Sequence, residues 1–373
     1  MQRCVMKLHG QSRTKCLDGL KKTTNYEVVA LTDKLVDNWG KIIDDLSVWS
    51  IYKVAEMYKE NEIDKVILSY DIAAGLMGKM VSEMISLGIN KEDVLIIKPE
   101  FFISYDEKEI CPYAEFKKIP YLEFHVADHC NLNCKGCSHF SPMVKGEKFA
   151  EYSVVEKDLM QLKTIVNYID AIHILGGEPF LNKELDRYVK LVRKIYPYSR
   201  IEIVTNGLLL KTVSDELFDV LKECNAGILV SVYPVMQTKI DGVLEWVKTK
   251  GVRVNCLETI QSFAYIFDSE GGHAKTAQRI NCPCVNLYKG YITPCPQIAY
   301  AGYFNEAMNE NIDIQDGRID IYDGELTFEK LVCELKKVRN ACDRCFRVSR
   351  EQLIVKNWEQ TKEIERSDYV YYK

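Results

Sequence analysis

The cysteines are the residues of this 373-residue chain best suited to chemistry, and there are 14 of them. Three lie in one short loop: Cys130, Cys134 and Cys137. Five form a second group: Cys282, Cys284, Cys295, Cys342 and Cys345. The others are scattered, and most are expected to be small apolar core residues: Cys4, Cys16, Cys111, Cys224, Cys256 and Cys333. In a large chain without an export signal, clustered cysteines favour metal binding over disulfides.

The first group reads Cys130-Asn131-Leu132-Asn133-Cys134-Lys135-Gly136-Cys137. Thiolates at this spacing can each ligate one iron of an iron–sulfur cubane, which leaves the fourth iron open to an exogenous ligand. A structural zinc site needs a closed set of four ligands, so His129 or His139 would have to complete it. Cysteines that bind no metal are the third interpretation.

The second group is brought together by a predicted hairpin over residues 287–293. The hairpin places Cys295 near Cys282 and Cys284, and Cys342-Asp343-Arg344-Cys345 completes a four-thiolate site. We predict Cys282, Cys295, Cys342 and Cys345 as ligands, with Cys284 as the alternative to Cys282. Spacing alone does not distinguish iron from zinc, because both accept four thiolates.

The elements that position the first group are strands and helices in alternation. Strand-like runs are expected at 121–127, 171–175, 200–205, 226–232 and 251–257, with amphipathic helical stripes between them. Repeated βα units predict an α/β fold with a full or partial parallel barrel, whose chemistry lies at the carboxyl ends of the strands. The cysteine loop follows the first strand, Gly176-Gly177 the second, Asn206 the third and Ser231 the fourth.

A cysteine loop of C-x3-C-x2-C spacing after a first barrel strand resembles the radical S-adenosylmethionine (SAM) superfamily, over roughly residues 118–350. Gly176-Gly177-Glu178-Pro179 resembles the GGEP motif of that superfamily. The resemblance implies a [4Fe-4S] cluster on Cys130, Cys134 and Cys137, with SAM chelated at its open iron. Reductive cleavage of SAM would then give a 5′-deoxyadenosyl radical that abstracts hydrogen from substrate. The cofactor-binding residues it implies are Gly176, Gly177, Glu178, Asn206 and Ser231.

The sequence departs from the family at Gly136, where an aromatic residue usually packs near the adenine, and Phe140 is the candidate to replace it. The second cysteine group resembles a twitch or shortened SPASM extension, which implies an auxiliary [4Fe-4S] cluster; a zinc ribbon is the alternative. Cys256, at a strand end, is a candidate catalytic hydrogen-atom donor or else a buried core residue. His125 and His173 either face the active site or are core histidines.

Residues 1–115 are predicted to form a separate, degenerate Rossmann-like α/β domain. Asp33 closes its second strand where a ribose would bind, but only Gly10 remains of the glycine-rich turn, with Ser12 and Thr14 in place of further glycines. The domain either binds a nucleotide or sugar nucleotide, or is a scaffold or docking domain. The remaining domains are expected at 116–275 (radical SAM core), 276–350 (auxiliary-cluster domain) and 351–373 (tail).

Charge and hydropathy limit the partners. The formal net charge of −5 gives no reason to expect nucleic acid or an acidic membrane surface. The chain has neither a membrane-spanning run nor a secretory signal at its N-terminus, so we expect a cytoplasmic protein. The resemblance implies an oxidoreductase or an isomerase (epimerase) that uses SAM and an electron donor such as flavodoxin or ferredoxin. Its substrate would be a peptide or a sugar or other small molecule; the alternative is a non-catalytic zinc- or cluster-binding protein that retains the fold.

Overall fold

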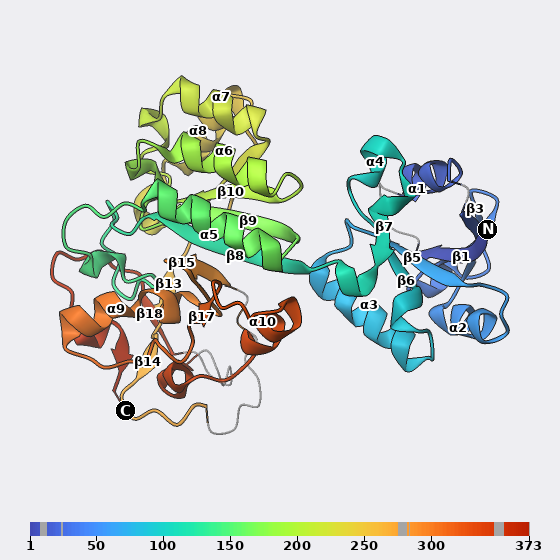
Figure 1. Cartoon of the computed structure of the whole chain (residues 1–373). Helices are drawn as coiled ribbons and strands as arrows, with labels where there is room; N and C mark the ends of the chain where they lie inside the picture. Colours follow the sequence, from blue (N-terminus) through green and yellow to red (C-terminus); the bar gives the residue numbers. More distant parts are fainter. Residues whose placement is uncertain (8–12, 24, 275–281, 283, 347–353, 373) are drawn as a thin grey trace. The chain divides into compact units, whose positions relative to one another are not determined.

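The computed structural model describes residues 1–7, 13–23, 25–274, 282, 284–346 and 354–372. The chain forms two compact units, Met1–Pro120 and Tyr121–Lys373 (Figure 1). Within the described residues, no helix combines the length and the apolar character needed to cross a bilayer.

The first unit is an α/β sheet of order β3-β4-β2-β1-β5-β6-β7 among the described residues. The central strands β2, β1, β5 and β6 run parallel, whereas β3 and β7 are antiparallel to their neighbours. The strands are β1 Gln2–Lys7, β2 Tyr26–Thr32, β3 Ile42–Ile43, β4 Leu46–Trp49, β5 Lys65–Ser69, β6 Val94–Ile97 and β7 Ile110–Pro112. The helices are α1 Arg13–Leu20, α2 Ile51–Lys59, α3 Ala74–Ser86 and α4 Phe101–Ser104.

The predicted Rossmann-like arrangement is confirmed. Its acidic residue, Asp33, is hydrogen-bonded to side chains of the same unit. Asp33 follows β2, and its carboxylate accepts hydrogen bonds from Lys7 Nζ at 2.7 Å and Asn38 Nδ2 at 2.6 Å. Burial opposes ionisation of Asp33, but these two donors hold its pKa below the ordinary value. Gly10 and Ser12 lie outside the described residues. Asp33 thus has a structural role within the unit.

The second unit is built on a sheet of order β12-β11-β10-β9-β8-β15-β16-β17 among the described residues. The run β9–β12 is parallel, and β15 adds to β8 in parallel before the antiparallel hairpin with β16. Its strands are β8 Lys118–Ala127, β9 Tyr168–Gly176, β10 Arg200–Thr205, β11 Ala226–Val230, β12 Val254–Cys256, β15 Asn286–Tyr288, β16 Tyr291–Thr293 and β17 Ile319–Asp320. This is a partial (β/α) barrel, as the spacing of the βα units predicts.

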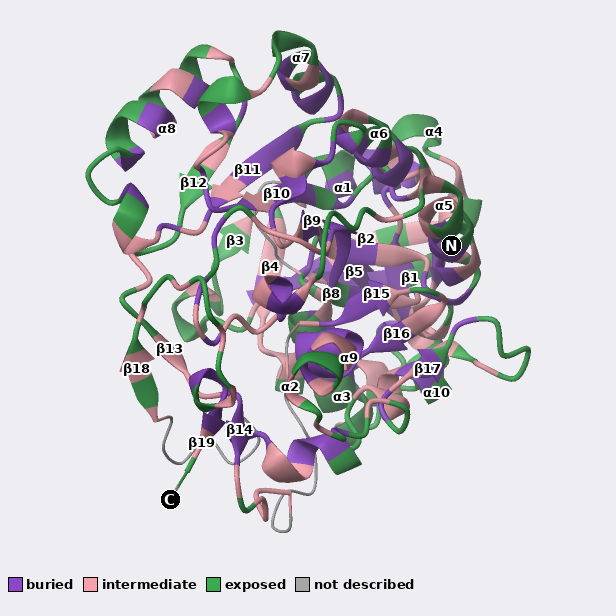
Figure 2. Cartoon of the chain, turned by 90° about the vertical axis from the view of Figure 1, so that its left-hand side faces the viewer, coloured by how far each residue is buried: buried purple, intermediate pink, exposed green. Residues whose placement is uncertain are grey.

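Helices cover one face of this sheet because each carries one apolar stripe. In α6, Leu185, Tyr188, Val189 and Val192 are buried at helical spacing, and Arg193 and Lys194 lie in the last turn, where cations are favoured. In Figure 1, α6, α7 and α8 stand on one side of the strands, and Figure 2 shows the outer surface of α8 exposed. The helices are α5 Tyr152–Ile165, α6 Leu185–Ile195, α7 Asp215–Glu223, α8 Ile240–Thr249, α9 Pro296–Met308 and α10 Phe328–Glu334.

The C-terminal residues pack against the second unit, so the prediction of a separate tail is wrong. Short strands β13 and β14 pair with β18 and β19 near the C-terminus. Tyr369 and Val370 are buried in a core cluster with Phe140 and Phe267. The bounds are β13 Ser262–Ala264, β14 Phe267–Asp268, β18 Val355–Asn357 and β19 Val370–Tyr371. The chain end therefore contributes to the same core as α9.

The two faces of α5 give a direct stability test. Leu162 is fully buried, whereas Met160 on the same helix is 59% exposed. We expect Leu162→Ala to lower the free energy of unfolding by about 2–5 kcal/mol, because it removes buried methyl groups and leaves a cavity. Met160→Ala, the matched control, should change it by less than about 0.5 kcal/mol. Urea unfolding followed by circular dichroism measures both, and equal effects would contradict the assignment of the buried face.

Candidate functional site

The thiols of the cysteine loop lie near one another directly after β8. Cys134 is buried, and Cys130 and Cys137 are half-buried. Burial is the largest cause that raises the pKa of each thiol, to about 12 for Cys134. Negative charge on Cys137 raises the pKa of both other thiols further, and Glu178 adds to the effect at Cys130. Thiolates so close together and so poorly solvated need a bound cation to be stable.

Several N–H groups point at these sulfur atoms. The backbone N–H of Leu132 donates to Cys130 Sγ at 3.3 Å, and Asn206 Nδ2 lies 3.7 Å from the same sulfur. The indole Nε1–H of Trp358 donates to Cys134 Sγ at 3.1 Å. N–H donors stabilise thiolate sulfur in iron–sulfur sites. The donors and the three thiols together fit an anionic, cluster-binding loop.

Gly176 and Gly177 hold the end of β9 against the start of the cysteine loop. A Cβ atom on Gly176 would lie 2.0 Å from the carbonyl oxygen of Ala127, and one on Gly177 would lie 2.2 Å from that of His129. The N–H of Gly177 donates to the Ala127 carbonyl at 2.8 Å, and the N–H of Glu178 donates to the His129 carbonyl at 3.1 Å. The glycines are required here because two backbones approach too closely for any side chain.

Glu178 is fully buried and ties the ends of β9 and β10 together. Its Oε1 accepts from Thr205 Oγ1 at 2.8 Å and from the Phe180 N–H at 3.2 Å, and its Oε2 accepts from the Asn206 N–H at 3.0 Å. Burial raises the pKa of Glu178 to about 7, although these donors oppose the shift. The carboxylate of Glu178 holds the ends of the neighbouring strands β9 and β10 together. Because it is fully buried, it has no exposed surface that a ligand could contact.

Asn206 and Ser231 both lie at strand ends beside the cysteine loop. Asn206 Nδ2 donates to Asn131 Oδ1 at 2.8 Å, and its own Oδ1 accepts from the Leu208 N–H at 3.0 Å. Ser231 is half-buried, and its N–H donates to the Thr205 carbonyl at 2.8 Å. Asn206 is therefore fixed against the loop by its side chain, and Ser231 by its backbone.

Cys256 lies at the end of the edge strand β12 and is exposed, so the interpretation as buried filler is wrong. It pairs in register with Val230, which is fully buried. Paired residues of parallel strands point to the same face. Cys256 therefore shares a face with Val230, opposite to the face that carries Leu229 and Ser231. This register does not support a catalytic role for Cys256.

The second cysteine group is brought together around Cys295. Burial raises the pKa of Cys295 most, and negative charge on Cys345, Cys282 and Cys342 raises it further. Cys284 instead interacts with Tyr121 of β8. Of the two alternatives in the sequence, Cys282 thus lies with the other thiols. Among the described residues, no three histidine, cysteine or acidic side chains already surround one point closely enough to hold a single metal ion.

Polar side chains line the sheet face opposite the covering helices. Tyr121 donates to Glu123 and lies 2.9 Å from His173 Nδ1, and burial lowers the pKa of His173 to about 4, so the ring is neutral. Asn286 on β15 is in register with Glu123. Both residues are almost completely buried. His139 Nε2 lies 3.7 Å from Glu123 Oε1 and helps to hold the pKa of this carboxyl below its ordinary value, whereas no described residue donates a hydrogen bond to Asn286 Oδ1.

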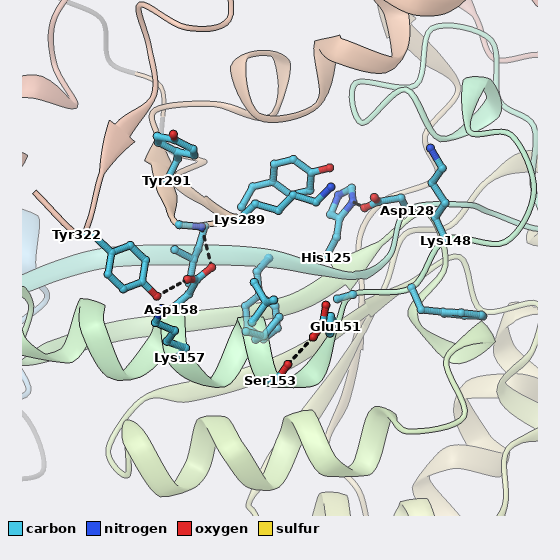
Figure 3. A pocket seen from close by; sticks show the side chains of 18 of the residues that line it. His125, Asp128, Lys148, Glu151, Ser153, Lys157, Asp158, Lys289, Tyr291 and Tyr322 are labelled. Carbon is cyan, nitrogen blue, oxygen red and sulfur yellow. Dashed lines mark hydrogen bonds and ion pairs between the residues drawn. The ribbon is translucent and has the colours of Figure 1, made fainter.

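A cavity of about 1120 Å³ opens between α5 and the β15–β16 hairpin. Figure 3 shows His125 beside Asp128 at one end, and Tyr322 bonded to Asp158 at the other. Asp128 accepts from Tyr303 Oη at 2.5 Å and lies 2.8 Å from His125 Nδ1, and the His125 ring stacks on Tyr300. His125 is thus a core histidine at the wall of this cavity.

Some residues of the site do not follow from the sequence pattern. Trp358 and Tyr233 stack at 5.8 Å beside the cysteine loop, and burial followed by the charges of the three thiols raises the pKa of Tyr233. A lone tryptophan in a polar C-terminal stretch was the available signal. Phe140, the candidate to replace an aromatic at Gly136, is fully buried in the core cluster with Phe267 and Tyr369, so that expectation is wrong.

Comparison with known proteins identifies the family of this site. Residues 125–253 match the family described as Radical SAM superfamily. A GTP 3′,8-cyclase of Sulfurimonas denitrificans is 29% identical over 137 residues, which are 34% of this chain and 43% of that protein. A GTP 3′,8-cyclase of Campylobacter jejuni subsp. doylei is 35% identical over 101 residues, 27% of this chain and 32% of that protein. The chain thus spans less than half the length of either relative.

Among solved structures, BtrN in complex with AdoMet and 2-DOIA is 20% identical, with a TM-score of 0.37, and the match covers 63% of this chain and 97% of that chain. The cofactors of the matched family are a [4Fe-4S] cluster and SAM. The loop that carries Cys130, Cys134 and Cys137 lies within the matched residues. Residues 125–253 of this chain therefore form a domain of the radical SAM superfamily.

Proposed function

We propose that Cys130, Cys134 and Cys137 hold the [4Fe-4S] cluster and that the chain is a catalytically active radical enzyme. The observation that carries the proposal is the group of three mutually interacting thiols, with N–H donors at Cys130 and Cys134, at the carboxyl end of the first barrel strand. Bound cluster and SAM supply a 5′-deoxyadenosyl radical for hydrogen abstraction. The retention of all three thiols and of Gly176 and Gly177 supports catalysis over a binding protein that only keeps the fold.

The chain's own residues fix the geometry around these cofactors. Gly176 and Gly177 let β9 approach the cysteine loop, and Glu178 holds the ends of β9 and β10 in register. Asn206 ties β10 to Asn131 within the loop. We assign SAM contacts to Gly176, Gly177, Asn206 and Ser231, and a positioning role to Glu178, because its carboxylate is fully buried.

We further propose an auxiliary [4Fe-4S] cluster on Cys282, Cys295, Cys342 and Cys345. The support is that the other three thiols of this set all act on Cys295, whereas Cys284 interacts with Tyr121. Four thiolates also suit zinc, so metal analysis decides between a cluster and a zinc ribbon. An auxiliary cluster would favour an oxidoreductase. The electron that cleaves SAM at the first cluster would come from a protein such as flavodoxin or ferredoxin.

The polar face of the barrel favours a small polar substrate over a peptide. Asn286 Oδ1 is a buried acceptor to which no described residue donates. On the neighbouring strand, the buried Glu123 Oε1 has His139 Nε2 at 3.7 Å, which is longer than a hydrogen bond. A buried acceptor without a donor is costly, by about 1–3 kcal/mol. A ligand with hydroxyl or amino groups would satisfy both. A sugar, an aminated sugar or a nucleoside meets this requirement, and the relatives named GTP 3′,8-cyclase make GTP one molecule to test.

Removal of the loop thiols should separate the two metal sites. We expect the wild-type chain, reconstituted without oxygen, to hold about eight irons and to form 5′-deoxyadenosine from SAM and dithionite. The variant with Cys130, Cys134 and Cys137 all changed to Ala should hold about four irons and form none. Cys333→Ala, at an exposed cysteine outside both groups, is the control. An iron-free wild-type protein, or one loaded with stoichiometric zinc, would refute the proposal.

A side chain at Gly177 should disturb the same site without touching a ligand. In Gly177→Ala the new Cβ would lie 2.2 Å from the carbonyl oxygen and 2.4 Å from the carbonyl carbon of His129, so the loop must move. We expect loss of most iron from the loop and of 5′-deoxyadenosine formation. Gly242→Ala in α8 meets nothing within 4 Å and is the matched control. Wild-type activity in Gly177→Ala would show that the close approach is unimportant.

Isotope transfer can test the substrate class without a named substrate. Deuterated bacterial extract is separated into a polar small-molecule fraction and a peptide fraction, and each is incubated with the loaded enzyme and SAM. We expect deuterium in 5′-deoxyadenosine with the small-molecule fraction, and a weaker transfer with Glu123→Gln, which alters the buried acceptor. Deuterated GTP is assayed separately. Transfer from the peptide fraction alone would overturn the assignment to a small molecule.

A further inference from the structure

The C-terminal segment of the chain lies along the cysteine loop. The N–H of Lys135 donates to the Glu359 carbonyl at 3.0 Å, and the N–H of Thr361 donates to the Asn133 carbonyl at 2.9 Å. Cys134 and Gln360 form an antiparallel bridge between these two bonds. The central residues of the loop are thus held by main-chain hydrogen bonds from residues 359–361.

The same segment is anchored on its other side. Strand β18 pairs with β13, and the N–H of Trp358 donates to the Gln261 carbonyl at 2.8 Å. The Trp358 ring stacks on Tyr233 with ring centroids 5.8 Å apart and planes 25° from parallel, and Tyr233 contacts Phe263 of β13. The backbone and the ring of Trp358 are therefore fixed independently of any ligand.

The side chain of Trp358 directs its one N–H group at a buried sulfur atom. The indole Nε1 lies 3.1 Å from Cys134 Sγ, and Cys134 is 5% exposed. At Gly136 a Cβ would lie 3.1 Å from the Asp368 carbonyl oxygen, and the backbone has a positive φ of 73°. The C-terminal segment therefore takes the space beside Gly136, and the aromatic surface next to the loop comes from Trp358 and Tyr233.

Hydrogen bonds to ligand sulfur are one of the means by which proteins set the potential of an iron–sulfur cluster. Reduction adds negative charge to the cluster, and an N–H group directed at a thiolate stabilises that charge. We propose that Trp358 is a positioning residue of the cluster, which donates its indole N–H to the Cys134 ligand and raises the reduction potential. This inference rests on the assignment of Cys134 as a ligand.

The test compares Trp358→Phe with the wild-type enzyme after anaerobic loading of both. Phenylalanine keeps a ring against Tyr233 but has no N–H. The measurement is a redox titration followed by electron paramagnetic resonance, with the cluster of the loop recognised by the change in its signal when SAM is added. We expect Trp358→Phe to hold the same iron as wild type and to show a more negative midpoint potential. Trp246→Phe in α8 is the control and should leave the potential unchanged.

A second variant separates the hydrogen bond from the packing. Trp358→Ala removes the ring as well, and we expect the same negative shift in potential with faster release of iron to a chelator. An unchanged potential in a fully loaded Trp358→Phe would overturn the inference while leaving the cluster assignment intact. A wild-type protein that takes up no iron would instead overturn the proposed function. Loss of iron from Trp358→Phe itself would mean that Trp358 only maintains the fold, and would also overturn the inference.

Discussion

The whole site depends on the close contact between the ends of β8 and β9. The backbone of Gly176 and Gly177 lies so near the carbonyls of Ala127 and His129 that a Cβ atom would overlap them. The contact is held by two main-chain hydrogen bonds across it. Because the cysteine loop leaves β8 at this point, the position of its thiols relative to the remaining strands is set here.

From this contact a series of hydrogen bonds continues along the carboxyl ends of the strands. Glu178 follows the two glycines and accepts from Thr205 and Asn206, which fixes the end of β10. Asn206 then returns to the loop through Asn131. The arrangement is closed, so each strand end is held by its neighbour and by the loop. The buried carboxylate of Glu178 lies close to Cys130, so a thiolate at Cys130 and this carboxylate repel each other. The positive iron of a bound cluster would relieve that repulsion.

Local sequence patterns were sufficient for the parts of the fold with regular periodicity. Strand β10 has the predicted bounds, and the helices between barrel strands follow their apolar stripes. Helix α9 was missed because it is buried on most sides, so that consecutive residues from Pro296 to Ala301 are all buried and show no stripe. The pairing of β14 with β19 was missed because it joins distant segments of two residues each, for which no local pattern exists.

The same distinction between local patterns and long-range contacts applies to the candidate site. The cysteines of the loop and the two glycines are close in sequence and carry their chemistry in their spacing. Trp358 reaches Cys134 only through the long-range pairing of β18 with β13, and Asn286 reaches the level of Glu123 only because β15 adds to β8. Contacts of this kind depend on the assembled sheet. The roles of Glu178 and Phe140 changed because burial, which the motif does not encode, decides what each can touch.

Strand β8 carries both the start of the cysteine loop and the proposed substrate-binding residue Glu123. The distance between them limits the geometry of the proposed reaction. The cysteine loop begins after Ala127, whereas Glu123 lies four residues earlier on the same strand. At about 3.3 Å per residue, the buried acceptors lie roughly 13 Å below the strand end. Hydrogen abstraction requires contact between the radical carbon and the substrate. A ligand held at Glu123 and Asn286 must therefore extend toward the strand ends, or the adenosyl group must point down along β8. An elongated polar molecule satisfies this constraint better than a compact one, which narrows the substrate class that the polar face supports.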